Sequence, residues 1–188
     1  MRIIVSLVLI SFLSGCATAP PRNLDNICEI FAEKPSWYKA TRAAEKKWGA
    51  PIPVQMAIIH QESRFRAKAK PPRKRFLGCI PLGRPSTAMG YTQALTVTWK
   101  NYMRNTGHYG ANRKNFADAC DFIGWYMYTT SRKLGVAPDN AYAHYLAYHE
   151  GWGGYARGTY LQKPWLLAVA RKVTLRSRRY HQQLRQRI

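Results

Sequence analysis

One glutamate in this chain stands where a carboxyl group could act as an acid. Glu62 lies in the segment 58–65, IIHQESRF, four residues after Ile58. The segment before it is predicted to be helical, with Pro53 in the first turn and a basic stretch after residue 63 that ends the helix. The apolar stripe of this helix consists of Val54, Ala57 and Ile58. Residues four apart share a helix face, so the carboxyl group is expected to point toward the core.

The position of Glu62 predicts a raised pKa. The C-terminal end of a helix carries partial negative charge, and apolar surroundings also disfavour ionisation. A carboxyl group that stays protonated near neutral pH can serve as a general acid. The alternative is a structural glutamate that pairs with Arg64 or Arg66.

Three short motifs in this chain resemble those of one enzyme family. The segment ESRF at 62–65 resembles the E-S-x-F motif of lytic transglycosylases of the soluble (SLT) type, relatives of goose-type lysozyme. GYTQ at 90–93 resembles the G-L-M-Q motif of this family, and AYHEG at 147–151 resembles its A-Y-N-A-G motif. The motifs occur in family order within residues 37–167. The chain departs from the family in having Thr for Met in the second motif and His-Glu for Asn-Ala in the third.

The resemblance implies cleavage of the bond between N-acetylmuramic acid and N-acetylglucosamine in peptidoglycan glycan strands. Glu62 would protonate the glycosidic oxygen and then, as a base, take the proton of the muramyl C6 hydroxyl. This hydroxyl attacks C1 of its own sugar and leaves a 1,6-anhydromuramyl end. Because the nucleophile is intramolecular, its effective concentration is high and the need for a second carboxylate is reduced. No cofactor and no metal ion is expected.

The resemblance also implies which residues bind substrate, and all of them come from the three motifs: Ser63, Gly90, Tyr91, Gln93, Tyr148, His149 and Glu150. Ser63 either contacts substrate or caps its helix. Gln93 either donates a hydrogen bond to an acetamido or hydroxyl group or is a surface amide. Tyr148 either places its hydroxyl near Glu62 or packs in the core. Gly90 would let the backbone approach the sugar.

The role of Glu150 distinguishes two possible enzyme activities, a lytic transglycosylase and a hydrolase. If it reaches the cleft it could activate water, and the protein would be a goose-type muramidase, which is a hydrolase. The structural alternative is that Glu150 pairs with Arg157 or caps the glycine-rich turn that follows it. His149 either hydrogen-bonds substrate or has a structural role at the end of its helix. A different class of protein is also compatible with the departures at Thr92, His149 and Glu150, namely a non-catalytic peptidoglycan-binding module of an envelope complex.

The N-terminal residues 1–15 are predicted to be a lipoprotein signal peptide. Arg2 supplies its positive charge, and the apolar stretch 3–12 is too short for a permanent membrane span. The segment LSGC at 13–16 resembles a bacterial lipobox, which implies a lipid on Cys16 and anchoring in a membrane. No Asp follows, so the resemblance implies the outer membrane, facing the periplasm. The alternative is an ordinary signal peptide with an incidental cysteine.

The net charge of +21 indicates anionic partners. Basic residues cluster at 64–75 and 171–187. Nucleic acid is the usual partner of such patches, but an exported chain does not meet it. Anionic envelope polymers or lipid head groups are the expected partners, and a solvated basic face without a dedicated partner is the alternative.

The remaining pattern predicts a mostly α, lysozyme-like single domain. Helices are expected at 36–48, 53–63, 96–106, 115–134, 139–150 and from 164 onward. Loop 67–89 is rich in proline and has room for a small β-hairpin. The domain is expected to occupy residues 36–188, with the lipidated cysteine and a tether at 16–35.

Three cysteines remain beside Cys16, namely Cys28, Cys79 and Cys120. They allow either one disulfide and one free thiol or three free thiols. Cys120 lies in an apolar helical stripe, which favours a buried thiol there.

Overall fold

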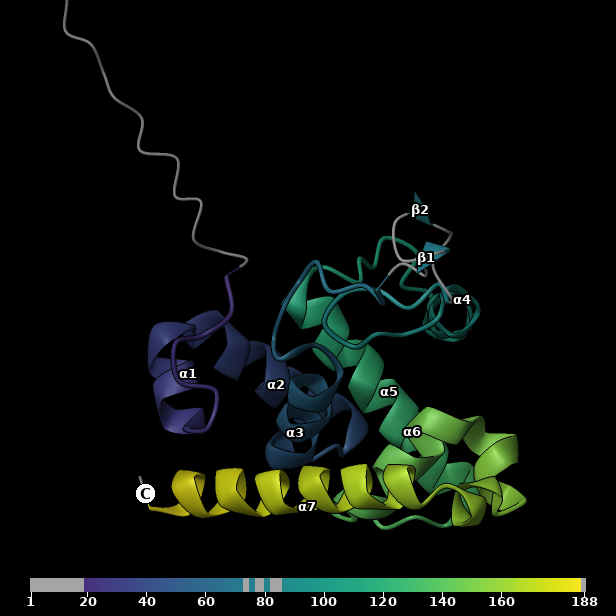
Figure 1. The fold of residues 1–188 in the computed structure, drawn as a ribbon. Helices are drawn as coiled ribbons and strands as arrows, with labels where there is room; N and C mark the ends of the chain where they lie inside the picture. Colours follow the sequence, from purple (N-terminus) through teal and green to yellow (C-terminus); the bar gives the residue numbers. More distant parts are fainter. Residues whose placement is uncertain (1–18, 73–74, 77–79, 82–85, 187–188) are drawn as a thin grey trace, which may run out of the picture.

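The computed structural model describes residues 19–72, 75–76, 80–81 and 86–186, and it is built mainly from helices (Figure 1). The elements in chain order are α1 (Ile27–Glu33), α2 (Pro35–Trp48), α3 (Ile52–Ser63), β1 (Arg75–Phe76), β2 (Ile80–Pro81), α4 (Thr96–Thr106), α5 (Phe116–Leu134), α6 (Ala141–Ala156), the 3-10 helix η2 (Thr159–Gln162) and α7 (Pro164–Arg185). The expected mostly α, lysozyme-like class is confirmed.

Helix α3, which ends at the Glu62 motif, is the central element of the core. It contacts α2, α5, α6 and α7, and every residue from 52 to 60 is buried. The expectation of a single apolar stripe was therefore too narrow, since a helix that is apolar on all sides is buried on all sides. Glu62 and Gln61 are the first half-buried residues of this helix, so the carboxyl group lies where α3 leaves the core.

Helix α7 forms one edge of the molecule, and the β-hairpin and α4 lie on the opposite side (Figure 1). It packs along α3 and α6. Its inward side chains, which are almost fully buried, are Leu166, Ala170, Val173 and Tyr180. Leu167 and Leu184 are partly buried against the same core.

Helix α1 lies within the span that was expected to be a tether. Ile27 and Ile30 are fully buried, and the Ile27 amide donates to the Gln183 side chain of α7 at 2.9 Å. The packed domain therefore begins before residue 36. The segment was missed because a helix of only seven residues has too few turns for a clear period.

Most helix ends follow the local signals. Gly49, Gly107 and Gly135 end their helices in left-handed conformation, and Asn115 caps α5 by accepting from two backbone amides. The starts of α2, α3, α5 and α6 differ from the expected ones by one or two residues. Helix α2 begins at Pro35 rather than at residue 36, and α6 begins at Ala141, capped by Asn140, rather than at residue 139.

The hairpin expected within loop 67–89 is present. Strands β1 and β2 are antiparallel, with Arg75 opposite Pro81 and Phe76 opposite Ile80. Among the helices that the structure describes, none has both the length and the apolar character to cross a membrane. The predicted signal peptide, Cys16 and Cys79 lie outside the described residues.

The two cysteines within the described range are free thiols. Cys120 is fully buried in α5, as its apolar stripe predicts, and Cys28 is half-buried with its Sγ 3.4 Å from the Gln183 carbonyl oxygen. A disulfide between Cys28 and Cys120 is not formed.

Candidate active site

The three motifs meet at one cleft. Glu62 at the end of α3, Gln93 before α4, and Tyr148, His149 and Glu150 of α6 all line a pocket of about 580 Å³. These segments are separated by dozens of residues in the sequence, and the packing of α3 against α6 brings the first and third together. A pocket of this volume is large enough for part of a glycan strand.

Glu62 has the raised pKa that its position predicts. Burial raises the pKa of its carboxyl group to about 7, and the hydroxyl of Tyr145, which hydrogen-bonds the carboxylate, opposes this effect. Helix α3 ends at Ser63, one residue after the glutamate, because Arg64 and Phe65 both adopt positive φ angles. Glu62 is therefore half-buried and lines the cleft at the end of α3.

The tyrosine that hydrogen-bonds the acid is Tyr145, and Tyr148 lies close enough for the charge of Glu62 to raise the pKa of its hydroxyl further, after burial. The Tyr148 hydroxyl donates to the Thr92 carbonyl oxygen at 2.6 Å, which ties the third motif to the second. Tyr145 lies one turn before Tyr148 on α6. It is 4% exposed, and its hydroxyl hydrogen-bonds Glu62. The sequence carried a usable signal, since residues three apart on a helix share a face.

Gln93 lines the cleft, but its amide nitrogen is already engaged. Nε2 donates to the Ala69 carbonyl oxygen at 3.0 Å and to the Gly90 carbonyl oxygen at 2.8 Å. Gln93 has a φ of 51°, and these two hydrogen bonds connect its side chain to the backbone at both Ala69 and Gly90. A sugar in the cleft would therefore meet Oε1 as an acceptor, and the expected donor role is corrected.

Three residues expected to bind substrate do not line the cleft. Ser63 is 1% exposed and its hydroxyl donates to the Ile59 carbonyl oxygen, in keeping with the alternative of a structural role at the end of its helix. Tyr91 is 2% exposed and packs edge-on against Trp37. Gly90 has a φ of 80°, and a Cβ there would lie 2.1 Å from the Arg113 carbonyl oxygen. The absence of a side chain at Gly90 therefore lets the backbone of Arg113 approach, and not a sugar.

Glu150 is held by neighbours within the protein. Its side chain is 4% exposed, and Lys163 Nζ contacts its two carboxylate oxygens at 2.8 and 2.9 Å. The Thr159 hydroxyl also donates to it, and His149 Nδ1 lies 3.0 Å away. These contacts, led by the Lys163 hydrogen bonds, lower the pKa of Glu150 to about 2. The partner is Lys163 instead of the expected Arg157.

His149 is exposed at the rim of the cleft. Its ring lies edge-on to that of Trp165, with the ring centres 5.1 Å apart, and more than half of Trp165 is exposed. Aromatic surface of this kind can stack on sugar rings. Among the residues described, no three His, Cys, Asp or Glu side chains are grouped to hold a metal ion.

A carboxyl group that stays partly protonated near neutral pH, in a cleft of this size, can protonate a glycosidic oxygen as the general acid of a glycosidase does. Comparison with known families gives the specific class. The profile of the family described as "Transglycosylase SLT domain" matches residues 4–187, so the chain belongs to this family. Its general function is the lytic transglycosylase type of peptidoglycan degradation. Among functionally curated proteins, no relative matches the chain significantly.

Proposed function

We propose that this protein cleaves the bond between N-acetylmuramic acid and N-acetylglucosamine and forms 1,6-anhydromuramyl ends. The observation that carries the proposal is the state of Glu62, which lines the cleft with a pKa of about 7. At this pKa both the acid and the base form are populated near neutral pH. The membership of the family supports the same reaction class.

Glu62 acts twice in the proposed mechanism. It first donates its proton to the glycosidic oxygen as the C1–O bond breaks, and the freed hydroxyl leaves with the N-acetylglucosamine part. The resulting carboxylate is stabilised by the Tyr145 hydrogen bond. It then takes the C6 hydroxyl proton while the C6 oxygen bonds to C1. Glu62 ends protonated, as it began, and water is not consumed.

The state of Glu150 favours this route over hydrolysis. A carboxylate that activates water must accept a proton from it. The carboxylate oxygens of Glu150 already accept hydrogen bonds from Lys163 and Thr159, which stabilise the ionised form and oppose the uptake of a proton. A carboxylate with a pKa of about 2 is also a weak base. The goose-type muramidase remains the second candidate because Glu150 does line the cleft.

The first prediction is that Glu62→Gln lowers kcat/KM on purified sacculi by about 10²–10⁴-fold, because a general acid supplies a factor of that size. Its thermal stability should not fall, since the amide avoids the cost of a buried charge. Mass spectrometry of the released muropeptides should show anhydromuramyl ends with the wild type. Reducing muramyl ends would identify a hydrolase instead. Tight glycan binding without any product would identify a non-catalytic binding module.

Glu150→Gln tests whether the enzyme is a transglycosylase that uses Glu62 alone or a hydrolase that also uses Glu150. If Glu62 works alone, this change should reduce activity far less than Glu62→Gln, and any loss should parallel a loss of stability. A loss as large as that of Glu62→Gln, with the fold retained, would favour a second catalytic carboxylate.

We further propose that the protein is an exported lipoprotein of the outer membrane, anchored through Cys16 and facing the periplasm. Peptidoglycan lies in that compartment, and the LSGC segment supplies the lipidation signal.

A further inference from the structure

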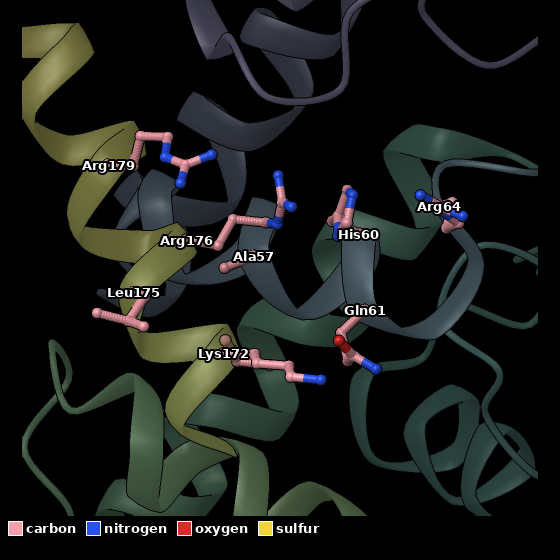
Figure 2. Close-up of a pocket in the computed structure, with 9 residues that line it drawn as sticks. Ala57, His60, Gln61, Arg64, Lys172, Leu175, Arg176 and Arg179 are labelled. Carbon is pink, nitrogen blue, oxygen red and sulfur yellow. The ribbon is translucent and has the colours of Figure 1, made fainter. Parts of the chain in front are cut away.

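A second hollow, separate from the cleft, lies between α3 and α7 (Figure 2). It measures about 490 Å³ and shares no lining residue with the cleft that contains Glu62. Figure 2 shows Lys172, Arg176 and Arg179 on α7, His60 on α3, and Arg64 on the turn that follows α3. Nothing in the proposed glycan cleavage uses this hollow.

The hollow carries an excess of positive charge. Four of its lining side chains are cationic, namely Arg64, Lys172, Arg176 and Arg179. Among the residues that the structure describes, no acidic side chain lines the hollow, but Asp25 pairs with two of the cations. Asp25 contacts Arg176 at 2.6 Å and Arg179 at 3.4 Å. Within the described residues, Arg64 and Lys172 form no ion pair, so the charge of this hollow is only partly compensated.

His60 lies among these cations and is affected by their charge. The imidazole lines the hollow and is 9% exposed. Burial, followed by the charges of Arg176 and Arg64, lowers the pKa of His60 to about 4, and Asp25 opposes this only weakly. The imidazole is therefore neutral at physiological pH. An anion placed among these groups would offset the repulsion and raise the pKa of His60.

We propose that the hollow between α3 and α7 binds the phosphate group of an organic phosphate. Guanidinium groups match the geometry of phosphate oxygens and can form two parallel hydrogen bonds to them. The excess of more than one positive charge favours a phosphate over a single carboxylate. A volume of about 490 Å³ lies in the range of small-molecule sites, so the organic part of a head group has room beside the phosphate. The proposal stands independently of the reaction at Glu62.

The test measures binding of glycerol phosphate and inorganic phosphate to the full chain by calorimetry. Lys172→Glu should weaken binding by at least about tenfold, because it removes an uncompensated cation and adds a repulsive charge. Arg171→Glu is the matched control. Arg171 is the preceding residue of α7, it is exposed, and it does not line the hollow. This variant should change the affinity by less than about twofold, although the net charge changes equally.

A second readout is the His60 imidazole signal in NMR. Added phosphate should raise its pKa in the wild type and in Arg171→Glu, and less in Lys172→Glu. Equal weakening by both variants, or no saturable binding of either phosphate, would overturn the proposal. Vesicles of phosphatidylglycerol in phosphatidylcholine then show whether the phosphate belongs to a lipid head group or to a soluble molecule. Lys172-dependent binding to these vesicles, above that to phosphatidylcholine alone, identifies a lipid head group, and binding of the soluble phosphates alone identifies a free phosphate.

Discussion

At the scale of single residues, the chemistry of this protein depends on how two glutamates are surrounded. Glu62 is half-buried beside one tyrosine hydroxyl, and burial raises its pKa to about 7. Glu150 lines the same cleft but is surrounded by donors, which lower its pKa to about 2. Environments that separate the pKa values of two acids in this way assign different roles to them.

Tyr145→Phe should move the pH profile of the enzyme. The Tyr145 hydroxyl stabilises the ionised form of Glu62, so its removal should raise the pKa of Glu62 above about 7. Activity depends on the protonated acid, and the fall of kcat/KM at alkaline pH should therefore shift to higher pH. A pH–rate profile on soluble glycan fragments measures this.

Tyr142→Phe provides the control for that variant, since Tyr142 lies on the same helix and is partly buried. Its profile should match the wild type. If Tyr145→Phe lowers activity uniformly without displacing the alkaline limb, Tyr145 serves packing rather than the protonation of Glu62.

At the scale of elements, the end of α6 and the start of α7 are joined through Glu150. Gly151 interrupts α6 with a φ of 71°, and Lys163 stands directly before the first residue of α7. The ion pair between Glu150 and Lys163 thus connects two elements across the turn that contains η2. This placement favours a structural role for Glu150.

Lys163→Ala should lower the free energy of unfolding by about 1–3 kcal/mol near neutral pH, because Glu150 loses two hydrogen bonds to a charged donor. The depressed pKa of Glu150 means that its contribution is present above its ordinary value of 4.5 and is lost as pH falls through about 2. The difference between wild type and variant should shrink over that interval in denaturant titrations. Lys114→Ala, at an exposed lysine, should show no such difference. A pH-independent loss would contradict the assignment.

Gly90→Ala should destabilise the second motif. The new Cβ would lie 2.1 Å from the Arg113 carbonyl oxygen, and the φ of 80° is unfavourable for alanine, so we expect a loss of about 2–3 kcal/mol. Gly49→Ala has a similar φ of 70° but no atom within 4 Å, and should cost only about 1 kcal/mol. Chemical unfolding of the two variants compares these costs, and equal losses would show that the close approach to Arg113 is unimportant.

At the scale of the whole molecule, the proposed export and the net charge would together define where the protein works. The N-terminal segment joins the packed domain at α1, whose buried isoleucines tie it to the core. The net charge of +21 should hold the domain near anionic surfaces of the envelope. Anchoring and charge together would keep the cleft close to its insoluble substrate.

Cys16→Ser should abolish lipid attachment, because the thiol carries the proposed lipid. Cells grown with labelled fatty acid should label the wild type and the control Cys28→Ser, but not Cys16→Ser. Fractionation should place the wild type in the outer membrane. Equal labelling of both variants, or none in the wild type, would exclude the lipoprotein assignment.

The sequence by itself determined the features that depend on neighbouring residues. Glycines at positions 49, 107 and 135 end their helices, and Asn115 begins one, because capping involves only a few adjacent backbone groups. The placement of Glu62 near the end of α3 follows from the same local signals. The order of the three motifs was also sufficient to identify the family that the comparison confirms.

The tertiary structure alone decided which groups meet. Glu150 is paired with Lys163, thirteen residues away, and Gly90 is packed against Arg113, because folding brought separate segments together. Tyr145 forms the hydrogen bond to Glu62 while the Tyr148 hydroxyl donates to Thr92, because the rotation of α6 is set by its packing on neighbouring helices. Such contacts depend on long-range burial, which no local pattern specifies.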